Sequence, residues 1–240
     1  MKLTYIYHSC YVLECDAFTI IIDYYEDTLK SSEKGLIHSY ILHRPGKLYV
    51  LSSHSHHDHF NPEILNWKQQ RNDIHYIFSR DILDTGLASK EDAIYLDKFE
   101  TYEDNSLKIK AYGSTDIGIS FLIQAEGKQI FHAGDLNNWH WNEECSPKEA
   151  QEYETNYLNE LELIAKDITH LNLAMFPVDP RLGKDYMKGA EQFISRIATD
   201  ILAPMHFDEA YNKASAFASY AETKKCRSIK WKCKGEEITL

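Results

Sequence analysis

The sequence predicts an α/β fold in which two β-sheets pack face to face and helices cover their outer faces. Two observations carry this prediction. Each half of the chain opens with a group of short apolar strands, and each group is followed by strands that alternate with helical patterns. A length of 240 residues suits one large domain of this type. Because no repeat, low-complexity tract or linker interrupts the chain, we expect a single domain over residues 1–240.

The first half opens with a predicted strand meander. Its segments are rich in β-branched and aromatic residues: Leu3–Tyr7, Tyr11–Glu14 and Phe18–Asp23. After a mixed stretch from Glu26 to His43, the apolar segment Lys47–Ser52 predicts a further strand. Pro62 suits the first turn of a helix that extends to about Gln69. Strand and helix patterns then alternate: a strand at Ile74–Ser79, a helix from Arg80 and a strand near Ala93–Leu96.

The second half repeats this plan. A second strand group is predicted at Leu107–Tyr112, Ile117–Gln124 and Gln129–His132, and Glu126-Gly127 forms the hairpin turn between the last two. The pattern is helical from Ser146 to Asp167, with Ser146-Pro147 as the start signal. The remaining predicted elements alternate: a strand at Leu171–Phe176, a helix at about Met187–Ile197, a strand at Ile201–Pro204, a helix at about Glu209–Lys225 and a strand near Ile238.

Charge and cysteine content limit the partners and the compartment. The 26 Lys+Arg against 37 Asp+Glu give a net charge of −11, which disfavours nucleic acid as a partner. The five cysteines form no CxxC pair and no signal pattern precedes them, which indicates free thiols in a reducing compartment. No apolar run approaches the roughly 20 residues that a membrane helix needs. We therefore expect a cytoplasmic protein without a membrane partner.

Four residues with metal-binding side chains follow the predicted strand Lys47–Ser52: His54, His56, Asp58 and His59. Residues two apart project to the same side while the chain remains extended, so His54 and His56 can bind together. Imidazole nitrogen and carboxylate oxygen suit Zn²⁺, Fe or Mn²⁺, whereas a Ca²⁺ or Mg²⁺ site would be built mostly from oxygen. The sequence therefore predicts a transition-metal centre at the end of this strand.

These four residues match the HxHxDH signature of the metallo-β-lactamase superfamily, and the chain resembles that family over nearly its whole length. The run His8-Ser-Cys10 is similar to the opening motif of its lactonase-like branch, which includes ascorbate phosphate lactonases. Ile22-Asp23 is similar to the strand-end aspartate of the family. The resemblance implies an αββα sandwich of two mixed β-sheets with helices on the outer faces.

The resemblance also implies ligands from later strands. Asp135 in His132-Ala-Gly-Asp135 is similar to the aspartate that bridges two metals, and His206 in Pro204-Met-His206 is similar to the last histidine ligand. Site one would then hold His54, His56 and a third group, and site two would hold Asp58, His59 and His206.

The third histidine of site one is absent. Ser114 stands at its position, and Asp116 is a candidate substitute. The chain is thus expected to hold either two metals or one ion mainly at site two, with Zn²⁺ expected first and Mn²⁺ or Fe as alternatives.

Weaker candidates surround this centre. Asp23 is expected to accept a hydrogen bond from a ligand histidine, and His8 is expected beside the site. Trp139, His140 and Trp141 follow Asp135 and are candidates for an aromatic pocket wall. The predicted loop after Leu171–Phe176 offers groups that could hold an anionic substrate: Arg181, Lys184 and Tyr186.

The predicted function is a metal-dependent hydrolase of a small-molecule ester, lactone, amide or phosphoester. Two divalent cations about 3.5–4 Å apart lower the pKa of a shared water from about 16 toward 7, which supplies metal-bound hydroxide, and Asp58 would orient it or carry a proton. One alternative is a mononuclear-iron oxygenase, although the persulfide dioxygenases of the family keep the third histidine. Another is a metal-binding protein of the same fold with reduced catalysis.

Overall fold

The strands of the first sheet carry apolar side chains on both faces. In β4 (Lys47–Ser52), Tyr49 and Leu51 pack into the core shared with the second sheet, whereas Leu48 and Val50 pack into a separate core on the outer face. Alternate residues of a strand point to opposite faces, so a continuous apolar run requires cover on both sides. The computed structural model describes residues 1–30 and 34–240.

Seven strands form the first sheet, in the order β14-β1-β2-β3-β4-β5-β6. The pairs from β14 to β3 are antiparallel and those from β3 to β6 are parallel. Besides β4, the strands are β1 (Lys2–Tyr7), β2 (Cys10–Glu14), β3 (Phe18–Ile22), β5 (Ile74–Ser79), β6 (Ile94–Leu96) and β14 (Glu237–Thr239).

The second sheet follows the same plan in the order β13-β12-β11-β10-β9-β8-β7. The pairs from β7 to β10 are antiparallel and those from β10 to β13 are parallel. The strands are β7 (Thr101–Glu103), β8 (Leu107–Gly113), β9 (Ile119–Ala125), β10 (Lys128–His132), β11 (His170–Pro177), β12 (Ala198–Met205) and β13 (Arg227–Ser228). The predicted sandwich of two mixed sheets is confirmed.

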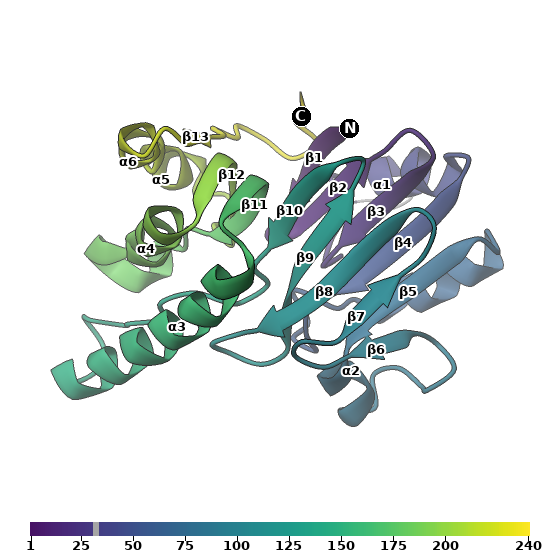
Figure 1. The fold of residues 1–240 in the computed structure, drawn as a ribbon. Helices are drawn as coiled ribbons and strands as arrows, with labels where there is room; N and C mark the ends of the chain where they lie inside the picture. The colour runs from purple at the N-terminus through teal and green to yellow at the C-terminus, as the bar shows by residue number, and fades with distance from the viewer. Residues whose placement is uncertain (31–33) are drawn as a thin grey trace.

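Helices cover the outer face of each sheet, as Figure 1 shows for α3 and α4 beside the second sheet. The first sheet is covered by α1 (Leu36–Ser39), the 3₁₀ helices η2 (Ile41–His43) and η3 (Pro62–Gln69), and α2 (Arg80–Asp84). The second sheet is covered by α3 (Pro147–Asp167), η4 (Pro180–Asp185), α4 (Lys188–Arg196), α5 (Tyr211–Ala216) and α6 (Ala218–Thr223). The longest, α3, begins with a capping box between Ser146 and Glu149.

The structure corrects four details of the predicted elements. Residues 62–69 form a 3₁₀ helix rather than an α-helix. The predicted helix over residues 209–225 is two short helices that meet at Phe217. The strand predicted from Ile117 begins at Ile119, because Gly118 adopts a φ of +77° and interrupts the extended chain. Strand β7 was not predicted, since its three residues are mostly exposed and lack an apolar pattern.

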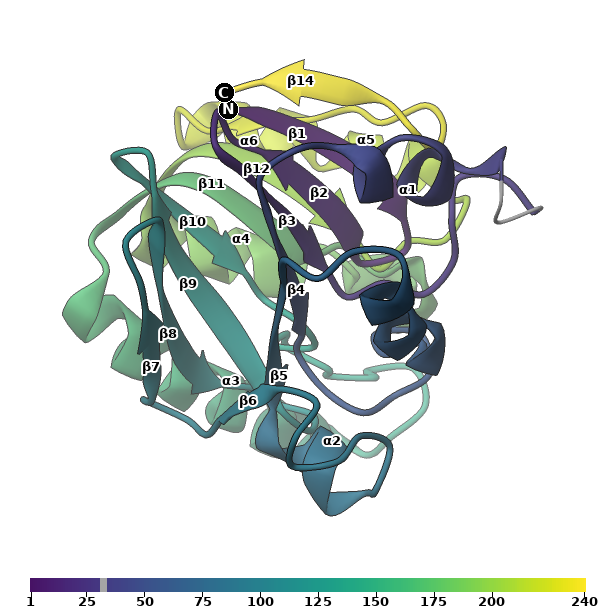
Figure 2. The ribbon, with the colours of Figure 1, turned by 90° about the vertical axis from the view of Figure 1, so that its right-hand side faces the viewer.

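The two ends of the chain lie side by side at one edge of the first sheet (Figure 2), where the Leu240 amide donates to the Met1 carbonyl at 3.1 Å. Within residues 1–30 and 34–240, every helix is too short or too polar to cross a bilayer.

Candidate metal centre

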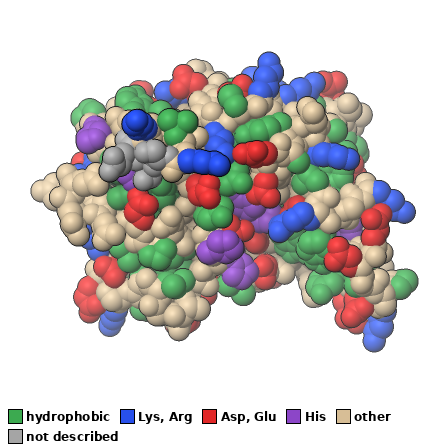
Figure 3. Space-filling model, turned by 180° about the vertical axis from the view of Figure 1, so that it is seen from behind, with side chains coloured by type: hydrophobic (Ala, Val, Ile, Leu, Met, Phe, Trp, Pro, Cys, Tyr) green, Lys and Arg blue, Asp and Glu red, His purple; other side chains and the backbone are tan. Residues whose placement is uncertain are grey.

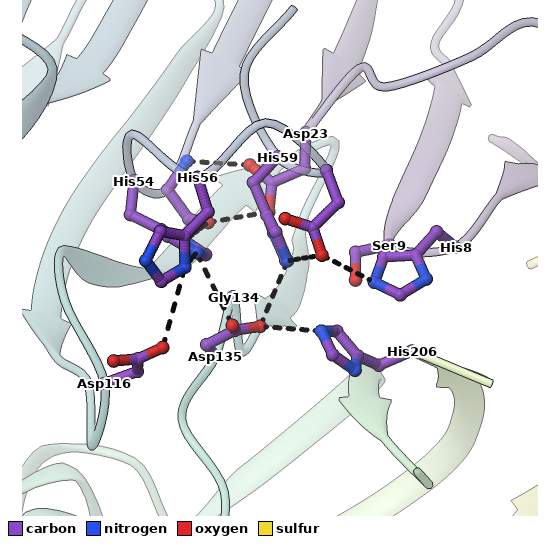
Figure 4. Close-up of polar contacts among 12 residues, drawn as sticks. His8, Ser9, Asp23, His54, His56, His59, Asp116, Gly134, Asp135 and His206 are labelled. Atoms are coloured by element: carbon purple, nitrogen blue, oxygen red, sulfur yellow. Dashed lines mark hydrogen bonds and ion pairs between the residues drawn. The ribbon is translucent and has the colours of Figure 1, made fainter. Parts of the chain in front are cut away.

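The predicted ligands come together where parallel strands of both sheets end. His8 follows β1, Asp23 follows β3, and the run from His54 to His59 follows β4. Asp135 and His206 follow β10 and β12 of the second sheet. The carboxyl ends of these strands lie at one edge of the sandwich, so residues far apart in sequence face one centre (Figure 4). Histidine and carboxylate side chains gather near the middle of the face in Figure 3.

Backbone strain accompanies this convergence. His8, Asp23 and His206 have φ values of +52°, +51° and +64°, a region that residues other than glycine rarely adopt. Gly134, directly before Asp135, has a φ of +52°, and a Cβ there would lie 2.8 Å from the Cβ of Ser53. The chain therefore turns sharply at each strand end to aim these side chains inward.

The candidate ligands divide into two groups. The ligand atoms of the inner cluster lie within 4.8 Å of one another, and its members are His8, Asp58, His59 and His206. The outer cluster meets the same limit and consists of His54, His56 and Asp135. Asp135 lies between the two groups, because its Oδ1 is 3.1 Å from His59 Nε2 and its Oδ2 is 3.5 Å from His54 Nε2.

Each histidine of the inner cluster is held from behind by a carboxylate. Nδ1 of His59 lies 2.8 Å from Asp23, and Nδ1 of His206 lies 2.9 Å from Asp179. Nδ1 of His8 lies 2.8 Å from Asp208. A carboxylate on Nδ1 fixes the ring orientation and leaves Nε2 free to bind a metal.

The atoms that face the middle of the inner cluster are buried and lack hydrogen bonds. Among the described residues, this holds for Nε2 of His8, His59 and His206 and for Oδ1 of Asp135. His206 Nε2 approaches that Oδ1 to 3.3 Å, yet the pair does not have hydrogen-bond geometry. Unpaired buried polar atoms are costly, and a shared cation would satisfy all four. The residues present therefore fit a transition-metal ion.

The outer cluster is less enclosed. His54 is buried, and its Nδ1 lies 3.0 Å from Ser53 Oγ, a hydroxyl rather than a carboxylate. The side chains of His56 and Asp116 are 46% and 44% exposed, and His56 Nδ1 lies 3.6 Å from Asp116 Oδ2. Asp116 therefore contacts the outer cluster through His56 but is not a member of the group whose ligand atoms lie within 4.8 Å of one another.

The charges of the centre stabilise one another. Burial lowers the pKa of His59, but Asp135 and Asp23 outweigh burial and hold this pKa well above its ordinary value. Burial raises the pKa of Asp135, but His59 and His206 hold it well below its ordinary value. Without a metal, a proton on the His59 imidazole offsets the charge of these carboxylates. A divalent cation would displace that proton, so metal binding is coupled to pH.

A hollow of about 260 Å³ opens beside the two clusters. Among the candidate substrate residues, Trp139, Trp141 and Arg181 line it. Asp116 lines it as well, while Ser114 accepts a hydrogen bond from the Asp116 amide through its Oγ.

Three other candidate substrate residues do not line this hollow. His140 is buried, and its Nε2 lies 3.1 Å from the Asp185 carbonyl oxygen, so it supports the loop. The Tyr186 hydroxyl donates to the Lys213 carbonyl at 2.9 Å. Lys184 lines a separate hollow with Met187. Lys184 lies in η4 and Tyr186 directly follows it, and neither side chain lines the hollow beside the clusters.

Sequence reasoning missed the supporting residues Asp179, Asp208 and Ser53, and the pocket residues Thr115 and Tyr153. Asp208 lies two residues after His206 and Asp179 lies in the turn after β11, so both carry a weak signal: an aspartate at the end of a strand that faces the centre.

Comparisons with known proteins agree with this fold. Residues 2–149 match the family model described as a beta-lactamase superfamily domain. No curated protein matches the chain in sequence. Igni18, a metallo hydrolase from the archaeon Ignicoccus hospitalis, has a TM-score of 0.70 at 17% identity, with 100% of this chain and 97% of that chain covered.

Two further structures are similar in fold. A possible metal-dependent hydrolase from Veillonella parvula has a TM-score of 0.62 at 12% identity, with 100% of this chain and 99% of that chain covered. CmlA, a diiron β-hydroxylase from Streptomyces venezuelae, has a TM-score of 0.67 at 14% identity, with 100% of this chain but 54% of that chain covered. The family match spans more than half of the sequence and includes the motif from His54 to His59 and Asp135, so the chain belongs to the beta-lactamase superfamily and has the metallo-β-lactamase fold.

Proposed function

We propose that this chain is a metal-dependent hydrolase that cleaves a small ester, lactone, amide or phosphoester. The observation that carries the proposal is the set of four buried, unpaired atoms that face one point: Nε2 of His8, His59 and His206, and Oδ1 of Asp135. The adjoining hollow gives a small molecule access to that point, because Asp135 and His206 form part of its lining.

A metal ion bound there would act as a Lewis acid on water and on the acceptor oxygen of the substrate. The protein supplies the rest. Asp58 is 23% exposed at the side chain, and its Oδ2 lies 3.3 Å from His8 Nε2. Burial raises the pKa of Asp58, but the neighbouring imidazoles of His8 and His59 hold it well below its ordinary value. Asp58 is therefore ionised at neutral pH, and its carboxylate is placed to orient the attacking water.

Zn²⁺ is the ion we propose first, because three imidazoles and a carboxylate suit it, with Mn²⁺ or Fe as alternatives. Two ions are proposed, one in each cluster. The ligand set would be Asp58, His8, His59 and His206 at the inner cluster, His54, His56 and Asp116 at the outer cluster, and Asp135 shared between them.

The test is an activity screen on metal-defined protein. Protein stripped by a chelator and reloaded with Zn²⁺, Mn²⁺ or Fe²⁺ is assayed against aryl and alkyl esters, lactones, amides and phosphoesters. We expect turnover that the chelator abolishes and one of these ions restores. Fully metallated protein without turnover would instead support the metal-binding alternative, and substrate-dependent oxygen consumption would support the iron oxygenase.

A further inference from the structure

The hollow beside the metal centre is small. Asp135 and His206 form its inner end, and its volume is about 260 Å³. Pockets for small molecules commonly measure roughly 300–1,000 Å³, so this one stands at the small end. With a reacting group at the metal centre, the space left suits one ring rather than an extended chain or a fused ring system.

One wall of the hollow is aromatic and starts at the metal centre. The rings of Trp139 and Trp141 are nearly parallel, at 14°, with their centroids 6.2 Å apart. Trp139 is fixed in place, because its Nε1 donates to the Asp135 carbonyl at 2.8 Å and its ring meets the His206 ring edge-on at 5.4 Å. The indole next to the candidate ligands therefore cannot turn away, and its orientation depends on the ligands themselves.

Two aromatic side chains that are more exposed than Trp139 extend this wall. Trp141 is only partly buried and has a φ of +40°, a strained conformation for a bulky residue. Tyr153 reaches the hollow from α3 and is 43% exposed. Solvent-exposed aromatic surface beside a reactive centre gains free energy when a flat apolar group covers it, and offset stacking favours an aromatic ring over a puckered one.

Arg181 also lines the hollow and offers it a hydrogen-bond donor. Arg181 donates from Nε and Nη2 to Asp179, at 2.9 and 2.6 Å to Oδ2. In the part of the chain that the structure describes, no acceptor is bonded to its Nη1, and the side chain is 57% exposed. Asp179 offsets the charge of Arg181, and the carboxylate of Asp116 lies on the same hollow. This environment favours a neutral ring with an acceptor oxygen over a second anionic group.

From these observations we infer that the substrate carries a single aromatic ring, which lies against Trp139, Trp141 and Tyr153 while its scissile group lies at the metal centre. This inference deepens the proposed hydrolase and names its substrate class: monocyclic aryl or arylalkyl esters, lactones or amides.

Equilibrium binding to Zn²⁺-loaded protein tests the ring site without turnover. Acetate, phenylacetate and cyclohexylacetate share one carboxylate and differ only in the attached group. We expect phenylacetate to bind roughly tenfold more tightly than acetate, and more tightly than cyclohexylacetate by calorimetry, because stacking adds to apolar burial. Equal affinities for acetate and phenylacetate, or tighter binding of cyclohexylacetate, would overturn the inference.

Variants locate the ring site. Tyr153→Ala changes an exposed residue and is expected to lower phenylacetate affinity about threefold while acetate affinity is unchanged. Trp141→Ala should remove most of the preference, and Trp141→Phe should restore part of it. Tyr40→Ala is the matched control, since Tyr40 is also 43% exposed but lies outside the hollow. A ring preference that survives both Trp141→Ala and Tyr153→Ala would place the ring elsewhere and contradict the inference.

The outcomes separate this inference from the proposed function. A ring preference in binding without hydrolysis of any tested ester, lactone, amide or phosphoester would retain the ring site and reject the hydrolase. Hydrolysis with equal kcat/KM for acetyl and phenylacetyl esters would retain the hydrolase and reject the ring site.

Discussion

The inner and outer clusters share Asp135 but differ in how their histidines are held. Every inner histidine has a carboxylate at 2.8–2.9 Å from Nδ1 and is buried. In the outer cluster, His54 has only the Ser53 hydroxyl behind it, and His56 is 46% exposed beside a comparably exposed Asp116. The imidazoles of the inner cluster are therefore oriented before a metal binds, whereas the side chains of the outer cluster lose conformational freedom when they bind one.

This comparison predicts unequal affinities. The inner site should fill first, because its ligands are oriented and their unpaired atoms are already buried. The outer site should fill second and release its ion more readily.

The largest effect is expected from His206→Ala. The variant removes an inner ligand, so we expect the inner ion to be lost and activity to fall below detection, since the remaining donors no longer enclose the ion. Elemental analysis after gel filtration measures the metal, and circular dichroism checks the fold. His170→Ala, which changes a 45% exposed histidine, is the control and should retain wild-type metal content.

A smaller effect is expected from Asp179→Asn. The amide keeps the shape but loses the charge that orients His206, and the loss of such a partner typically weakens metal binding 10–100-fold. Competition with a chromophoric chelator measures the affinity. The matched control is Asp200→Asn, because Asp200 also lies 2.8 Å from a histidine nitrogen, on exposed His170. Equal losses of metal affinity in Asp179→Asn and Asp200→Asn would contradict the role given to the carboxylate behind His206.

The smallest effect is expected from Asp116→Ala. Since Asp116 is exposed and lies at the outer cluster, we expect outer-site affinity to fall by roughly tenfold or less while the inner site is unchanged. Asp116→His should tighten the outer site, because it supplies an imidazole in place of the third histidine that is absent at Ser114. Metal content at limiting and at excess Zn²⁺ separates the two sites, and an inner-site loss in Asp116→Ala would contradict this assignment.

Much of the fold could be predicted from sequence because apolar periodicity and strand length are local properties. The strands Lys47–Ser52 and Ile74–Ser79 were predicted with the bounds that they have in the structure. The break at Phe217 and the short strand β7 depend on packing and sheet pairing, which leave little local pattern.

Some residues of the candidate site could likewise be predicted from the sequence, and others only from the fold. The cluster from His54 to His59 is visible because its members are contiguous, and the resemblance added Asp135 and His206. The pairing of His8 with Asp208 joins residues 200 positions apart, so only the folded chain shows it. His140 and Tyr186 were assigned to the substrate by residue type, but their polar atoms bond to backbone carbonyls in the fold. The lactonase-like branch, the single domain and the cytoplasmic location stay predictions.

Stepwise titration of the metal-free protein with Zn²⁺ tests the two unequal sites most directly, with His8→Ala and His56→Ala measured alongside. The account predicts two binding steps, of which the tighter is weakened by His8→Ala and kept in His56→Ala, while the weaker is lost in His56→Ala. A tighter step that is lost in His56→Ala but kept in His8→Ala would contradict it, as would a single step for two equivalent ions.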